Sequence, residues 1–462
     1  MVSLVVLLVV GACDRNSTPA SKAGSGAAGE HRGPRPNLVV VSLDTVRRDH
    51  VSLYGYSKPT TPFLDELAAE GWVFDSAFTV DTNTNPAHAS LLTGLHPYQH
   101  GSQANGMLLD SSVATLAEVL SASGYRTGGF VSGAPLRDDA SGLARGFDLY
   151  DDDFEGARRS GDITTSAAID WLDAEATPAA DGAELQPFFL FVHLYDAHGP
   201  YEPTTEELAA LPGSDGSGLV ARVPEYQRLY GADGTLLREL HEYVDRYDAL
   251  IRRVDGLLAR IWAQLDASNT YVLITSDHGE TFDERWYQLS HGAQVYDEQI
   301  RIPMVLLGPG LEPRRLSEPV SLVDFVPSIV QRLAVDWPSA TSGIDWFAGD
   351  LPARPMFSTA RASQERYANL GYELAILSRI HSVRSEGWKL HQFPGREGDE
   401  FQLYDLATDP GEQVDVLQQN REEARRLFSA LRDWNPGFRE SVRRSGLSKG
   451  LAEQLRSLGY LN

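Results

Sequence analysis

At residues 37–44 the chain reads Asn37-Leu38-Val39-Val40-Val41-Ser42-Leu43-Asp44, an apolar run of strand length that ends in an acid. A continuous run of this kind is typical of a strand that is buried on both faces, as in a parallel sheet covered by helices. Ligands of such sheets bind at the carboxyl ends of the strands. We therefore expect Asp44 to lie where chemistry can occur.

Further runs of the same kind follow along the chain and alternate with helical patterns. One strand-like run leads into the segment Tyr195–Tyr201, and another leads into Ser276-Asp277-His278-Gly279-Glu280. Alternating strands and helices predict an α/β fold with a large, mostly parallel sheet sandwiched by helices. The expected strands are 72–78, 126–131, 187–194, 270–275 and 302–307, and the expected helices are 62–71, 84–94, 113–123, 235–265 and 322–333.

The pattern changes beyond about Arg354. Short strand candidates occur at 381–384, 388–390 and 401–406, and a charged helical pattern runs from Glu412 to Trp434. This predicts a smaller C-terminal antiparallel sheet with a helix packed on it. We place the main domain at residues 36–350 and the C-terminal subdomain at 351–462.

Composition limits the choice of function. The chain has 462 residues, of which 42% are hydrophobic, so it can bury a large core. It carries 40 Lys and Arg against 64 Asp and Glu, a formal net charge of −24. Because phosphate backbones are bound by a surplus of Lys and Arg, nucleic acid is not expected as a partner.

The first 35 residues have the pattern of an export segment. Val2–Val10 is almost wholly apolar but too short to cross a bilayer stably, as in a signal peptide. Val10-Gly11-Ala12-Cys13 resembles a bacterial lipobox, although a chance cysteine in a leader would look the same. We expect a signal peptide with lipobox at 1–13, a flexible tether at 14–35, and a lipid-anchored or periplasmic location in the bacterial envelope.

A second stretch points to chemistry: Thr84-Asn85-Pro86-Ala87-His88-Ala89-Ser90-Leu91-Leu92-Thr93-Gly94, which reads as the first turns of a helix. A helix N-terminus presents unsatisfied N–H groups, which would stabilise an oxyanion formed near Thr84. The alternative is that Thr84 only caps the helix.

Asp44, Asp277 and His278 follow buried strands, and with Thr84 they form a set of oxygen and nitrogen ligands suited to a divalent cation. His278 favours Zn or Mn, with Ca or Mg as alternatives. A metal-bound hydroxyl loses its proton more easily, which is how a threonine could attack near neutral pH.

Several of these motifs together resemble the sulfatase family of the alkaline phosphatase superfamily, in the right order from about residue 36 to 415. They are Asn37–Asp44, Thr84–Gly94, His193–Tyr201, Ser276–Glu280, His291-Gly292 with Tyr296-Asp297-Glu298 and Arg301-Ile302-Pro303, and Leu403–Leu406 with Asp409-Pro410. The resemblance implies an alkaline phosphatase-like fold with a metal at Asp44, Asp277 and His278.

The resemblance also implies site roles. Thr84 would be nucleophile and metal ligand, while His198 and His291 would bind the substrate anion, protonate the leaving group or hold a second cation. Asp196 could join such a second site. The spacing does not decide whether a second metal binds.

The departures from the family pattern concern the nucleophile and its neighbours. Sulfatases have Cys or Ser, which is oxidised to formylglycine, at the place of Thr84, and Arg at that of His88, where we expect a contact to the substrate anion. A Lys-x-His signature is missing at Gly128–Gly133, and Thr45 replaces a second acid. Threonine cannot give the aldehyde, so we expect no formylglycine.

These departures favour branches whose Thr acts unmodified on phosphorus. The leading hypothesis is a metal-dependent hydrolase of phosphate mono- or diesters, or of related sulfate or phosphonate esters, through a covalent Thr84 intermediate. Three alternatives are a sulfuric ester hydrolase without formylglycine, an envelope phosphoethanolamine-type transferase, and a catalytically inactive binding protein. The substrate would be a small, glycan-linked or lipid-linked anionic ester; Glu284, Trp286 and Tyr287 are candidates to line its pocket.

Overall fold

The computed structural model describes residues 35–175, 186–214, 218–231, 233–286, 288–362, 378–394 and 399–435. The signal peptide, the lipobox cysteine Cys13 and nearly all of the tether lie outside these residues, so the predictions for that segment and for the location remain predictions.

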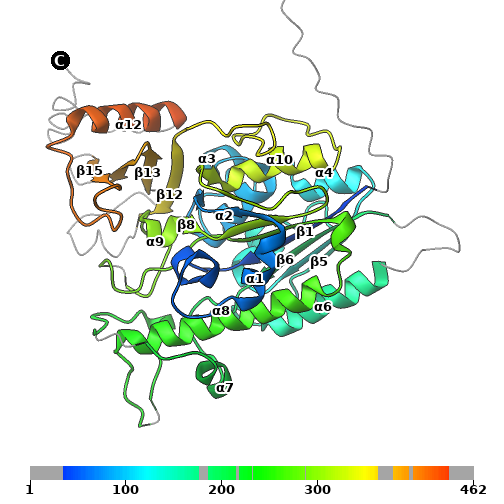
Figure 1. Cartoon of the computed structure of the whole chain (residues 1–462), viewed down its shortest axis with the longest axis horizontal. Helices are drawn as coiled ribbons and strands as arrows, with labels where there is room; N and C mark the ends of the chain where they lie inside the picture. The colour runs from blue at the N-terminus through cyan, green and yellow to red at the C-terminus, as the bar shows by residue number, and fades with distance from the viewer. Residues whose placement is uncertain are drawn as a thin grey trace, which may run out of the picture. The chain divides into compact units, whose positions relative to one another are not determined.

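A large, mostly parallel sheet forms the centre of the fold (Figure 1). Its strand order is β10-β2-β9-β7-β1-β6-β4-β5, and β9 runs antiparallel to both of its neighbours. The strands are β1 (Asn37–Leu43), β2 (Trp72–Phe74), β4 (Arg126–Val131), β5 (Leu149–Asp151), β6 (Phe188–Leu194), β7 (Thr270–Ser276), β9 (Met304–Leu307) and β10 (Arg314–Leu316). The predicted α/β class is confirmed.

The register of the three central strands positions the site. Leu43 at the end of β1 lies opposite Leu194 of β6 and Ser276 of β7. The residues that follow these strands therefore leave the sheet at one edge. This alignment is why acids far apart in sequence meet there.

Helices cover both faces of the sheet, because side chains alternate along each buried strand. Leu38 and Val40 of β1 pack in one core with α2, α4 and α10, whereas Val39 and Val41 pack in the other with α1, α6 and α8 (Figure 1). These helices are α1 (Pro62–Leu67), α2 (Thr84–Thr93), α4 (Leu116–Ala122), α6 (Gly161–Glu175), α8 (Leu240–Trp262) and α10 (Phe325–Arg332).

The C-terminal part forms the predicted antiparallel sheet, in the order β12-β13-β14-β15, with α12 packed on it. Lys389 of this sheet is fully buried and pairs with Asp297 and Glu412, which ties the sheet to α9. The elements are α9 (Asp297–Ile300), β12 (Met356–Arg361), β13 (Arg379–Ser385), β14 (Trp388–Phe393), β15 (Glu400–Asp405) and α12 (Arg421–Trp434). Shorter elements are β3 (Ala77–Phe78), α3 (Pro97–His100), α5 (Asp138–Ser141), α7 (Thr205–Ala209), β8 (Arg301–Ile302) and β11 (Val320–Ser321).

Several predicted boundaries were wrong. The strand expected at 72–78 is divided into β2 and β3, which belong to different sheets, and the helix expected at 113–123 begins at Leu116. Three further differences have a local reason. The last helix begins at Arg421 rather than Glu412, because the Glu412 carboxylate accepts hydrogen bonds from the Asp297 N–H and from Lys389. The long helix begins at Leu240, since Leu236 forms a bridge with Tyr230. The strand expected at 302–307 is divided at Pro303, which lacks an N–H for the ladder.

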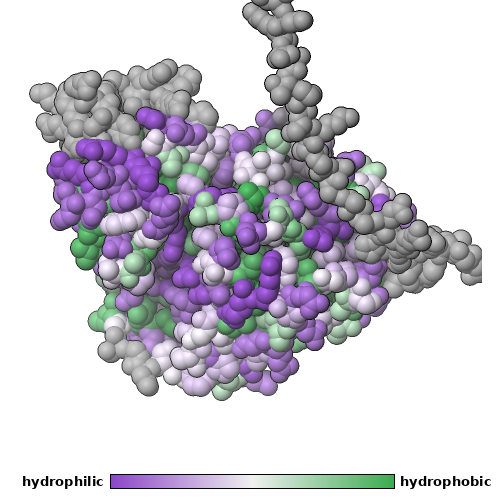
Figure 2. All heavy atoms as spheres, turned by 45° about the horizontal axis from the view of Figure 1, so that its top comes forward, coloured by the Kyte–Doolittle hydropathy of each residue, from purple (hydrophilic) through white to green (hydrophobic). Residues whose placement is uncertain are grey.

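The surface is consistent with the acidic composition. On the face shown in Figure 2, hydrophilic residues predominate and hydrophobic ones form separate patches. In the described ranges, no helix combines the length and the apolar character that a membrane crossing requires.

Candidate active site

The ends of β1 and β7 bring Asp44, Asp277 and His278 together, as the sequence predicted. One ligand atom from each lies within 4.8 Å of the others, and all three residues are buried. Asp277 is fixed in place because its Oδ1 accepts hydrogen bonds from the backbone N–H groups of Thr45 (3.0 Å) and His278 (2.8 Å). The strand register thus builds a rigid carboxylate and imidazole cluster.

Four side-chain atoms in this region are buried and have no hydrogen-bond partner in the part of the chain that the structure describes. They are Asp44 Oδ1, Thr84 Oγ1, Asp277 Oδ2 and His278 Nε2. Buried polar atoms without partners are costly, so a group of them indicates a ligand. The hydroxyl Oγ1 of Thr45 is likewise unpartnered.

The surroundings shift the pKa values of the two carboxylates in opposite directions. Burial, followed by the charge of Asp277, raises the pKa of Asp44 well above its usual value. Burial would also raise the pKa of Asp277, but the imidazoles of His278 and His88 outweigh it and hold that pKa below its usual value. Two acids this close favour a bound cation, because it would let both ionise.

Thr84 is the first residue of α2, with Asn83 before it as the N-cap. The side chain is buried, with 1% of its surface exposed. The expectation that this helix start leaves its N–H groups free for an oxyanion was wrong for Asn85, whose N–H donates to Asn105 Oδ1 (2.9 Å). Asn105 is exposed, and it was not identified from the sequence because it lies 20 residues beyond Asn85.

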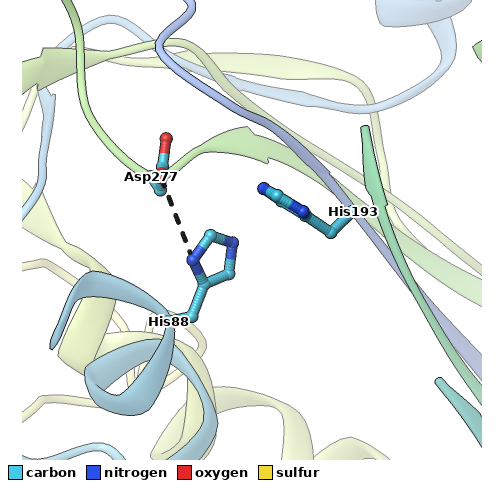
Figure 3. A group of neighbouring side chains, drawn as sticks. All are labelled: His88, His193 and Asp277. Carbon is cyan, nitrogen blue, oxygen red and sulfur yellow. Dashed lines mark ion pairs between the residues drawn. The ribbon is translucent and has the colours of Figure 1, made fainter. Parts of the chain in front are cut away.

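His88 lies one turn after Thr84 and connects the helix to the carboxylate cluster (Figure 3). Its Nδ1 donates to the Thr84 carbonyl oxygen (2.7 Å) and lies 3.9 Å from Asp277 Oδ2, so Thr84 and Asp277 are near neighbours. Its Nε2 accepts from the Ser42 hydroxyl (2.8 Å). Burial lowers the pKa of His88 to about 4, so the ring is neutral at pH 7.

His193 is a functional candidate that sequence reasoning did not identify. It is the one polar side chain within the apolar strand β6, and its Nε2 lies 2.9 Å from Asp44 Oδ2. Its ring is 5.0 Å from that of His88, centroid to centroid. Burial lowers the pKa of His193 to about 4.

His198 and His291, the two histidines that the resemblance implies for the site, lie near each other and near His278. The ring centroids of His291 and His278 are 4.5 Å apart, and those of His291 and His198 are 4.8 Å apart. Burial would lower the pKa of His291, but Glu280, with Oε1 at 3.3 Å from Nδ1, outweighs it and the net pKa is raised. Burial, reinforced by His291, lowers the pKa of His198 well below its usual value.

Other candidates face away from this cluster. The Asp196 carboxylate accepts from the Gly161 N–H and pairs with Arg253, so it is not available to a second cation. Glu284 pairs with Arg47 and lines a separate charged cavity of about 320 Å³ with Arg48. Trp286 is 41% exposed, and Tyr287 lies outside the described residues.

The donor set of Asp44, Asp277 and His278 fits a divalent cation. It offers two carboxylate oxygens and one imidazole nitrogen, all buried and unpartnered among the described residues. His278 Nδ1 donates to the Gly279 carbonyl oxygen (3.0 Å), which directs the lone pair of Nε2 into the site. Such a second hydrogen bond is usual for a metal-binding histidine.

Comparison with known proteins identifies the family of this chain. The family model Sulfatase matches residues 36–335. The uncharacterized sulfatase YidJ of Escherichia coli K12 is 26% identical, covering 88% of this chain and 89% of its own length. The fold is similar to the phosphonate monoester hydrolase of Agrobacterium radiobacter, with a TM-score of 0.66 at 23% identity, covering 86% of this chain and 94% of that one.

A further structure of similar fold is a protein solved in complex with its substrate D-glucosamine-2-N,6-O-disulfate, with a TM-score of 0.68 at 19% identity, covering 89% of this chain and 98% of that one. The family match extends over well over half of the chain. This protein therefore belongs to the alkaline phosphatase-like sulfatase family and is a hydrolase of ester bonds.

Proposed function

We propose that the protein hydrolyses phosphate mono- or diesters, or related anionic esters, by a metal-dependent double displacement in which Thr84 is the nucleophile. The observation that carries this proposal is the group of four buried atoms without partners: Asp44 Oδ1, Thr84 Oγ1, Asp277 Oδ2 and His278 Nε2. His88 Nδ1 lies 2.7 Å from the Thr84 carbonyl oxygen and 3.9 Å from Asp277 Oδ2, so Thr84 is near the expected cation, where a hydroxyl can be activated as a nucleophile. When bound, a divalent cation there would lower the pKa of the Thr84 hydroxyl and screen the charge of the substrate.

The reaction would have two steps with inverse proton movements. In the first, the Thr84 hydroxyl loses its proton as Oγ1 attacks phosphorus, the bond to the leaving oxygen breaks, and that oxygen takes up a proton. In the second, water loses a proton as it attacks the phosphoryl-threonine, the bond to Oγ1 breaks, and Oγ1 takes up a proton, which restores the hydroxyl. Asn105, whose Oδ1 accepts from the Asn85 N–H, is beside the start of α2 and is a candidate donor to the substrate anion.

His291 is the stronger candidate for the proton donor. The Glu280 carboxylate lies beside its Nδ1 and favours the imidazolium, whereas His198 has no carboxylate contact among the described residues. Glu280 is itself held by the Tyr201 hydroxyl (3.0 Å). An imidazolium whose pKa is raised above its usual value keeps its proton up to a higher pH and can deliver it to the leaving oxygen.

Replacing Glu280 with glutamine tests this role. Without the carboxylate, the pKa of His291 falls. The basic limb of the plot of kcat against pH is therefore expected to move to lower pH, and kcat at pH 8 to fall by about 10²-fold. A Glu284→Gln variant, whose carboxylate pairs with Arg47 instead, is the matched control and should leave the limb in place. An unchanged profile in Glu280→Gln would remove His291 from the mechanism.

A second candidate function is sulfate-ester hydrolysis without formylglycine. The similarity to the sulfatase YidJ favours it. Thr84 could attack sulfur as it would attack phosphorus, and the leaving oxygen would take up a proton in the same way. A panel of nitrophenyl phosphate, bis-nitrophenyl phosphate, nitrophenyl phenylphosphonate and nitrophenyl sulfate separates the two. We expect one of the phosphorus esters to have the highest kcat/KM; a preference for the sulfate would assign the second function instead.

The same panel addresses the two remaining alternatives. A transferase would release nitrophenol faster when a sugar acceptor is added, because the acceptor hydroxyl replaces water in the second step. A binding protein would release nitrophenol from none of the esters faster than the buffer control does. We propose that water is the acceptor and that the substrate is a small or glycan-linked anionic ester.

A further inference from the structure

Three residues beside the expected catalytic cation form a second cluster of metal ligands. His88 comes from α2, His193 from β6 and Asp277 from the loop after β7, and Figure 3 shows their side chains converging from these three elements. One ligand atom of each lies within 4.8 Å of the others, and all three are buried. We propose that His88, His193 and Asp277 hold a second divalent cation, next to the one expected at Asp44, Asp277 and His278.

The hydrogen bonds of His88 match those of a metal ligand. Its Nδ1–H donates to the Thr84 carbonyl oxygen, which leaves the lone pair on Nε2. His278 has the same arrangement, with Nδ1 on the Gly279 carbonyl and Nε2 free for an ion. A metal-binding histidine almost always donates its other N–H in this way. In this structure His88 Nε2 accepts a hydrogen bond from the Ser42 hydroxyl. Rotation of that hydroxyl would leave the lone pair of Nε2 available to an ion.

The distances suit two ions that share carboxylates. Ligands about 2.1 Å from one ion in tetrahedral geometry lie about 3.4 Å apart. His193 Nε2 lies 2.9 Å from Asp44 Oδ2, and Asp277 Oδ2 lies 3.4 Å from His278 Nε2 and 3.9 Å from His88 Nδ1. Asp277 therefore lies between the rings of His278 and His88, and it is the residue that the two groups of candidate ligands share. Asp44 directs Oδ2 to His193 and keeps Oδ1 unpartnered.

Charge gives an independent reason for a second cation. The ion-pair contacts of Asp44 and Asp277 within the described residues are with imidazoles alone, not with lysine or arginine. One divalent ion would only neutralise the two carboxylates. A second ion would add to the positive charge that the His291 imidazolium of the proposed mechanism offers to an anionic ester.

The test is to count ions in the full-length protein. After removal of metal with a chelator and reloading with Mn²⁺, elemental analysis should give two Mn per chain, and electron paramagnetic resonance should show a coupled pair, because ions that share a carboxylate lie roughly 4 Å apart. His88→Gln and His193→Gln should each retain one Mn with an uncoupled signal. His241→Gln, on α8, is the control and should retain two.

Three results would overturn the proposal: one Mn per chain in the wild type, two coupled ions retained in both histidine variants, or loss of both ions from a variant whose circular dichroism is unchanged. The second site shares Asp277 with the proposed catalytic centre. The ion count tests the second site, and turnover by Thr84→Ala tests the proposed function. If the wild type holds one ion and Thr84→Ala still abolishes turnover, the proposed function stands and only the second site fails.

Discussion

Thr84→Ala is expected to lower kcat/KM for the best ester substrate by on the order of 10³-fold to 10⁶-fold, the range seen when a catalytic nucleophile is removed. The variant should keep its fold, because Thr84 Oγ1 makes no hydrogen bond in the described structure that would be lost. Thr84 also has Asn83 as its N-cap, so the helix start does not depend on the threonine hydroxyl. The measurement is steady-state kinetics together with circular dichroism.

Thr84→Ser is the matched control for this substitution. Serine keeps the hydroxyl and removes only the methyl group, so the variant should retain activity within about tenfold of the wild type. If alanine and serine variants turn over substrate equally well, Thr84 is not the nucleophile.

Asp277→Asn is expected to produce the second large loss, about 10³-fold in kcat/KM, which corresponds to about 4 kcal/mol of transition-state stabilisation. The amide removes the charge of the carboxylate that lies between His278 and His88. The variant should also bind less Mn²⁺ than the wild type, measured by elemental analysis after dialysis. Chelation of the wild type should give a loss of the same order, reversed by added Mn²⁺.

Asp196→Asn serves as the control for the loss of a buried carboxylate at the same edge of the sheet. Asp196 accepts from the Gly161 N–H and pairs with Arg253, so its substitution should reduce stability but leave the bound metal unchanged. Equal metal loss in Asp196→Asn and Asp277→Asn would show that the effect of the latter is not specific.

The sequence predicted the parts of this site that stand at the ends of apolar runs. Asp44 and Asp277 follow strands whose burial is evident from composition, and parallel strands end at one edge of the sheet. The order of the strands did not need to be known for this expectation. His278 and Thr84 could be located in the same way, from their places after a strand and at a helix start.

The remaining parts depend on contacts between distant segments, which local patterns do not contain. His193 lies inside an apolar run, where a histidine is usually a core residue; its contact with Asp44 spans 149 positions. Asp196 follows the same strand and was a candidate for a second cation site, but it pairs with Arg253 of α8 instead. Which way a loop carboxylate points depends on the helices that pack beside it.

The contact of Asn105 shows a second limit of sequence reasoning. Free N–H groups at a helix start are a general property of helices, yet here a side chain 20 residues away accepts the hydrogen bond of Asn85. The contact places Asn105 beside the start of α2, which the helix start alone would not reveal.

The central claim is that Thr84 Oγ1 forms a covalent bond to the transferred group. The most direct measurement is rapid acid quenching of the Mn²⁺-loaded enzyme during turnover of its best ester, followed by mass spectrometry of the proteolytic peptides. The account predicts a phosphoryl or sulfuryl group on the peptide that contains Thr84, absent from the Thr84→Ala variant. Steady turnover with that peptide unmodified at every quench time, or the modification on another residue, would contradict it.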